Sequence, residues 1–195
     1  RFRNMADTAP VMIWVSGPDR LCTYFNKQWL DFTGRSMEQE LGNGWAEGVH
    51  RDDFDRCLKI YNAAFDRTEQ FRMEYRLRRA DGEFVWIYDN GTPRFSSDGE
   101  FLGYIGSCID ISDQKEAEDA VRTARDEIRL IADALPVLVS EVDKDCYYRF
   151  NNLAYEKWFD QPTDQITGHH MREVLGEAVW DRIQPLVAKT LAGQE

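Results

Sequence analysis

The chain has 195 residues and a formal net charge of −11, with 43% hydrophobic and 30% charged residues. This balance is typical of a folded, soluble protein of one or two domains and excludes a disordered chain. The negative charge disfavours nucleic acid and anionic membranes as partners, and no apolar run approaches the ~20 residues of a membrane span. We therefore expect no nucleic-acid partner and no membrane contact.

The first predicted elements are a short helix and a hairpin. The helix passes through Met5 and ends before Pro10, and two apolar runs, 11–15 and 21–25, flank a Gly-Pro-Asp turn. Asn26 is predicted to cap the next helix, which Gly34 ends, and Ser36 starts a further short helix. Together these residues predict a β-hairpin followed by short helices.

A longer amphipathic helix and three strands come next. Asp52 and Asp53 are predicted to cap the helix, whose apolar residues recur every three to four positions. Strict alternation over 71–78 predicts a half-buried strand, and turn residues separate it from strands at 84–88 and 101–111. The pattern predicts an α+β fold: a five-stranded antiparallel sheet with short helices on one face.

The chain repeats itself without a gap at an offset of 126 residues, so that Arg3 aligns with Arg129 and Asn26 with Asn152. Glu195 corresponds to Glu69, so the second copy lacks counterparts of the last three strands. Such a half-domain leaves apolar helix faces uncovered. We expect the natural chain to continue beyond Glu195, or a partner to complete this half.

A helix rich in charged residues is predicted between the two copies. Its apolar positions alternate in spacings of four and three, which is the a/d pattern of a coiled coil. These positions are Ala117, Val121, Ala124, Ile128, Ile131 and Leu135. The narrow stripe favours a parallel homodimer, and the alternative is that the helix packs against its own sheet.

Several phrases resemble the PAS/PAC family of sensory domains. They are FNKQWLDFTG from Phe25, EYRLRRADGEFVWI from Glu74 and GEFLGYIGSCIDIS from Gly99, with Ser112 placed to cap the helix that follows. The resemblance implies a PAS domain with its PAC motif at 1–111, a helical linker at 112–134 and an incomplete second PAS domain at 135–195. It also implies a ligand cavity between the helices and the inner sheet face.

The resemblance suggests six residues that line this cavity, although plain core filling explains large aromatic side chains as well. They are Trp45, Tyr61, Phe65, Tyr75, Tyr88 and Ser107. A photosensory flavin site needs a reactive cysteine where this chain reads Gly42-Asn43-Gly44-Trp45, and a haem ligand is conceivable only at His169 or His170. We expect neither cofactor, no metal site and no catalytic residues, and we expect reduced, mostly buried cysteines.

These observations predict a cytoplasmic sensory module that senses a small ligand or relays a conformational signal to an output domain in the same parent chain. A histidine kinase is the first expectation for that output, and a diguanylate cyclase is the second. The alternative class is a ligand-free dimerisation or protein-interaction scaffold.

Overall fold

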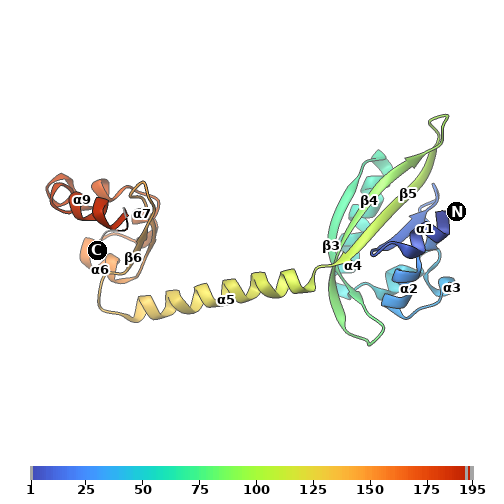
Figure 1. Ribbon diagram of the computed structural model, residues 1–195, viewed down its shortest axis with the longest axis horizontal. Coiled ribbons are helices and arrows are strands. Elements are labelled where there is room, and N and C mark those ends of the chain that lie inside the picture. The colour runs from blue at the N-terminus through green and yellow to red at the C-terminus, as the bar shows by residue number, and fades with distance from the viewer. Residues whose placement is uncertain (1, 192, 194–195) are drawn as a thin grey trace. The chain divides into compact units, whose positions relative to one another are not determined.

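The computed structural model describes residues 2–191 and 193. The chain divides into two compact units, residues 1–118 and 119–195, and each is described by itself (Figure 1). The first unit contains α1 (Phe2–Thr8), β1 (Met12–Ser16), β2 (Cys22–Phe25), α2 (Lys27–Thr33), α3 (Met37–Glu40), the short 3-10 helix η1 (Gly44–Gly48), α4 (Arg51–Arg67), β3 (Phe71–Arg78), β4 (Phe84–Phe95) and β5 (Phe101–Asp110). The helix α5 (Ser112–Ala134) continues from it into the second unit.

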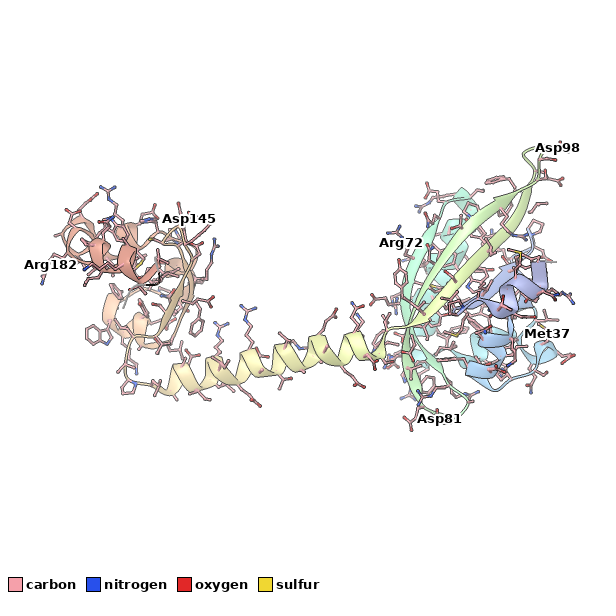
Figure 2. All side chains as sticks on the ribbon, viewed as in Figure 1. Met37, Arg72, Asp81, Asp98, Asp145 and Arg182 are labelled. Atoms are coloured by element: carbon pink, nitrogen blue, oxygen red, sulfur yellow. The ribbon has the colours of Figure 1, made fainter. Side chains whose placement is uncertain are left out.

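The five strands form one antiparallel sheet in the order β2-β1-β5-β4-β3. The hairpin tips, at Asp81 and Asp98, lie at opposite ends of this sheet (Figure 2). Strand β4 extends to Phe95, beyond the predicted end at Tyr88, because its second half pairs with β5. The predicted fold class is confirmed.

One face of the sheet packs against α2, η1 and α4 and forms the core. Side chains alternate across a strand, so β3 turns Met73, Tyr75 and Leu77 inward and its arginines outward. The opposite face near β1 and β2 is covered by α1, whose Ala6 packs against Val15 and Tyr24. The helices therefore cover the inner face, with α1 as an addition on the outer one.

Short polar side chains fix the starts of the helices. Asn26 caps α2 by accepting from the Trp29 backbone N–H, and Gly34 ends that helix in the left-handed conformation, as predicted. The predicted cap of α4 is wrong. His50 is the cap, and its Nδ1 accepts from the Asp52 N–H, whereas Asp53 lies in the first turn and is buried.

Helix α5 begins at Ser112, directly after the sheet. Ser112 is not the predicted capping residue that precedes the helix; it is the first helical residue, and its hydroxyl accepts from the Trp86 backbone N–H at 3.1 Å. The helix buries Ala132, and all six residues of the predicted stripe are exposed, Val121 at 71% and Ile128 at 66%.

The second unit reproduces the start of the first. It contains the hairpin β6 (Ser140–Val142) and β7 (Tyr148–Asn151), then α6 (Ala154–Phe159), α7 (Thr163–Ile166), α8 (Met171–Leu175) and α9 (Glu177–Leu191). Asp160 replaces Gly34 and adopts the same left-handed conformation at the end of its helix, with φ 51°. The sequence repeat is therefore also a structural repeat.

Candidate functional site

A small cavity lies between the inner sheet face and the helices of the first unit. Its volume is about 10 Å³, close to the smallest space that admits one water molecule. Its walls are largely aromatic and carry one carboxylate. The lining residues are Trp14, Cys22, Phe25, Trp29, Trp45, Tyr61, Met73, Tyr75 and Asp89.

Three of the six predicted pocket residues, Trp45, Tyr61 and Tyr75, line this cavity. Phe65 is buried beside Tyr61, at a ring distance of 4.8 Å, but does not reach the cavity. Tyr88 and Ser107 lie on the outer face of the sheet, since they alternate with the inward residues Asp89 and Cys108. The prediction that these two residues line the cavity is wrong, because the inward-facing side chain is the next one along each strand.

Two glycines allow aromatic rings to lie flat on the inner sheet face. A Cβ at Gly106 would stand 2.1 Å from the Trp14 ring, and one at Gly91 would stand 2.2 Å from Phe71. The rings of Trp14 and Phe71 stack at 6.0 Å with an interplanar angle of 21°. The glycines thereby fix the position of Trp14 beside the cavity.

Asp89 is the charged group of the cavity, and 3% of it is exposed. The Trp14 indole N–H donates to its Oδ1 at 2.9 Å, and the Tyr75 hydroxyl donates to its Oδ2 at 3.4 Å. The described residues that line the cavity include no lysine, arginine or histidine. The carboxylate is hydrogen-bonded but has no opposite charge there.

Burial raises the pKa of Asp89 to about 6, and the hydrogen bonds from Trp14, Cys108 and Tyr75 limit the rise. The titratable groups around it are Tyr75, Cys108, Cys57, Tyr61 and Cys22. Burial raises the pKa of each of these groups, so they stay protonated at neutral pH. Asp89 is therefore the group in this cluster that changes charge between pH 5 and 7.

A wall of two rings separates the cavity from a surface groove. Trp45 and Tyr61 line both spaces, and their rings meet edge to face at 5.8 Å. The groove has a volume of about 410 Å³. The Tyr61 hydroxyl donates to the Arg20 carbonyl at 3.0 Å, whereas the buried Trp45 indole N–H has no partner among the described residues.

Six lining residues were not predicted from the sequence: Trp14, Cys22, Phe25, Trp29, Met73 and Asp89. Asp89 follows Val85 and Ile87 at intervals of two, and all three side chains are buried. Extending the alternation of β4 beyond Tyr88 would have placed this carboxylate inside. The alternation is difficult to recognise in the sequence, because Trp86 and Tyr88 place bulky aromatic rings on the outer face as well.

Contacts from the sheet hold the start of α5. The guanidinium of Arg76 lies 5.4 Å from the Trp86 ring centre, and the Lys115 ammonium lies 5.6 Å from it. Lys115 also pairs with Glu74 at 2.6 Å, and Arg76 donates to Asp53 on α4 at 2.8 Å. Burial tends to raise the pKa of Asp53, but hydrogen bonds from Arg76 and Arg56 hold it at about 2.

The histidines and cysteines considered in the sequence show no arrangement that would hold a metal ion among the described residues. His170 caps α8 by accepting from the Arg172 N–H at 3.0 Å, and His169 is exposed. The four cysteines are free, and Cys146 is the least buried of them. Across the described residues, no cluster of His, Cys, Asp or Glu is placed to hold a metal ion. None of the helices in that part of the chain is long and apolar enough to cross a bilayer.

Two sequence models described as PAS fold match the chain, one over residues 23–108 and the other over 132–195. The two matches fall on the two copies of the repeat, and the fold of the first unit agrees with them. The chain belongs to the PAS-fold family, and its two copies form a PAS sensory region.

Similar proteins include signalling proteins. The chain is 46% identical over 132 residues to the uncharacterized protein y4lL of Sinorhizobium fredii, covering 68% of this chain and 16% of that protein. It is 27% identical over 139 residues to the peroxide stress-activated histidine kinase mak1 of Schizosaccharomyces pombe, covering 67% of this chain and 8% of the kinase. The chain thus spans less than a fifth of either relative.

A solved structure of a sensory box histidine kinase/response regulator from Burkholderia thailandensis is also similar. It is 30% identical, with a TM-score of 0.50, and the match covers 66% of this chain and 98% of that one. PAS regions of this kind are thus found in histidine kinases.

Proposed function

We propose that the first unit is a sensory input module whose state is relayed through α5 to an output domain in the same parent chain. A histidine kinase is the favoured output, since two of the similar proteins are histidine kinases. A diguanylate cyclase remains the second candidate. The observation that carries the proposal is the set of contacts that joins the cavity helix α4 to α5.

These contacts form a continuous path. Helix α4 carries Tyr61 in the cavity wall and Asp53 in its first turn. Asp53 binds Arg76 on β3, and both Arg76 and Lys115 of α5 lie over the Trp86 ring. A displacement of α4 by a change in the cavity would therefore alter the contacts that orient the first turn of α5.

We further propose that α5 pairs with the α5 of a second copy in a parallel homodimer. Its a/d stripe is exposed in the structure, which supports pairing with a partner over packing against the sheet of the same unit. The division into a domain at 1–111, a linker at 112–134 and a partial domain from 135 remains part of this proposal.

A ligand-free scaffold is the alternative function, and the small volume of the cavity favours it. A space of about 10 Å³ leaves no room for an organic ligand unless a side chain of the wall moves. The two functions differ in whether a change in the first unit alters α5.

Amide hydrogen exchange over 112–134 in the whole chain tests the relay. Asp53→Asn removes the charge that Arg76 pairs with, so we expect faster exchange in the first two turns of α5. Asp55→Asn is the control, because Asp55 is exposed on the same helix. Equal exchange in the two variants would contradict the relay and favour the scaffold.

Sedimentation analysis tests the dimer. We expect the whole chain to sediment as a dimer and Val121→Glu with Ile128→Glu to convert it to a monomer, because a desolvated charge disrupts an a/d seam. Thr123→Glu, which places a glutamate on α5 outside the stripe, serves as the control. A wild-type monomer at high concentration would overturn this part of the proposal.

A further inference from the structure

The electrostatics of the cavity are unbalanced. Asp89 is buried among aromatic rings, and no basic side chain is among the described residues that line the space. Burying a carboxylate without a counter-charge is costly, and folded proteins usually pair such a group. Trp14 and Tyr75 satisfy part of its hydrogen-bonding capacity but contribute no charge.

The rings around Asp89 suit a cation. Trp14 and Trp45 both meet Tyr61 edge to face, at 6.1 and 5.8 Å with interplanar angles of 62° and 60°. The Tyr61 ring is thus steeply inclined to both tryptophan rings, and all three rings line the cavity. Aromatic faces attract ammonium groups, most strongly where water is excluded, and a carboxylate within the same cage adds charge complementarity.

The wall also contains an unused hydrogen-bond donor. The indole N–H of Trp45 is buried and has no acceptor among the described residues, although Trp45 is only 7% exposed. A buried donor of this kind costs free energy unless it finds an acceptor. An oxygen atom on a bound molecule would supply one.

We propose that this cavity binds a small ammonium cation that carries an oxygen acceptor, with the cationic group at Asp89 and the alkyl part among the rings of Trp14, Trp45 and Tyr61. The inference deepens the proposed function, because it rests on the cavity being the sensory site and names the class of ligand that the site takes.

The ligand enters by displacement of Trp45. The cavity itself admits about one water molecule, while the groove beyond the Trp45 and Tyr61 rings has about 410 Å³. Tyr61 is held by α4 and by its bond to the Arg20 carbonyl, whereas Trp45 lies on the five-residue η1 without a side-chain bond of its indole. Rotation of the Trp45 side chain would join the two spaces.

Two probes of nearly equal size separate charge recognition from simple filling. Titration of the whole chain with 2-aminoethanol and with ethylene glycol, followed by the indole N–H resonances, compares an ammonium with a hydroxyl on the same two-carbon frame. We expect 2-aminoethanol to bind at least about tenfold more tightly above pH 7. Its affinity should fall about tenfold per pH unit below pH 6, as Asp89 takes up a proton.

Variants locate the preference. Asp89→Asn keeps the shape and removes the charge, so the two probes should then bind equally; Asp66→Asn, at an exposed carboxylate, should leave the preference intact. Trp45→Phe removes the indole N–H, so both probes should bind several-fold more weakly. It also assigns the Trp45 resonance.

Three results would overturn the inference: binding of neither probe to the wild-type chain, equal affinity for both, or an unchanged preference in Asp89→Asn. The relay is tested separately by exchange in α5 without any probe. A chain that prefers the ammonium but shows no α5 response to Asp53→Asn would contradict the proposed relay and leave the ligand class standing.

Discussion

The two copies of the repeat share the hydrogen bonds around one asparagine but differ in how much apolar surface they bury. The Asn26 Oδ1 accepts a hydrogen bond from the Ile13 N–H, and its Nδ2 donates to the carbonyls of Ala6 and Val11. Asn152 makes the same three bonds with Val139, Ala132 and Val137, each 126 residues further on. Local polar contacts therefore specify this hairpin and helix start in both copies.

The cores differ because the described part of the second unit contains no counterparts of β3, β4 and β5. In the first unit these strands cover Trp29, which is 1% exposed. In the described part of the second unit, the counterpart of Trp29 is Tyr155, which is 6% exposed in a small cluster with Tyr148 and Ile166. Trp158, the counterpart of Phe32, is 70% exposed, whereas Phe32 packs against the core of the first unit. Hydrogen bonds therefore set the local form in both copies, while the larger apolar core of the first unit is built with side chains from its three additional strands.

The largest expected effect contrasts two tryptophans. Trp29→Ala should lower the free energy of unfolding of the first unit by about 3–5 kcal/mol, because it empties a fully buried site. Trp158→Ala should change the stability of the second unit by less than about 0.5 kcal/mol. Urea denaturation followed by NMR resolves the two units. Similar losses in both variants would break the comparison.

Substitution of the two asparagines tests whether the shared hydrogen bonds contribute to the stability of both units. Asn26→Ala leaves several backbone groups without partners, and we expect a loss of about 3–4 kcal/mol in the first unit. Asn152→Ala should destabilise the second unit and leave the urea midpoint of the first unchanged. A shift of the first-unit midpoint in Asn152→Ala would show that the two units do not unfold independently.

Asp89 gives the first unit a pH dependence. Its pKa is about 6 in the folded state against an ordinary value of 3.8, so the folded state binds more protons between these values and stability falls as pH rises through them. The cost reaches about 3 kcal/mol above pH 7. The free energy of unfolding of Asp89→Asn minus that of the wild type should therefore be more favourable at pH 8 than at pH 4, by about this amount. A stability difference that is independent of pH would contradict the assignment.

Tyr104 provides the smallest expected effect. Its single hydroxyl hydrogen is shared between the carbonyls of Ala64 at 2.8 Å and Glu69 at 2.6 Å, where α4 ends. Tyr104→Phe should cost about 1–2 kcal/mol in thermal or urea unfolding. Tyr88→Phe, on the outer sheet face, is the matched control and should have no measurable effect. An equal loss in both would argue against a role for the hydroxyl.

Much of the fold followed from the sequence because its signals are local. The alternation in β3, the caps at Asn26 and Ser36 and the 126-residue repeat all depend on neighbouring residues or on direct self-comparison. The α4 cap was misassigned because His50, a weaker sequence signal than two acidic residues, accepts the bond, and Asp53 turns instead to Arg76 on a strand.

The cavity was only half predictable, since its walls depend on strand phase and long-range pairing. Asp89 meets Trp14 across 75 positions of sequence, and no local pattern indicates that bond. Similarly, Gly106 reads as a strand-weakening residue until the Trp14 ring is seen against it.

The anchoring of α5 has a mechanical consequence. A helix of 23 residues is about 34 Å long, and this one is held near one end by Lys115 and Ser112. If α5 tilts about this anchor, a tilt of about 5° moves its far end sideways by about 3 Å. Under the proposed relay, a displacement too small to repack the core around Trp14 and Asp89 would thus become a sideways shift of this size at the far end.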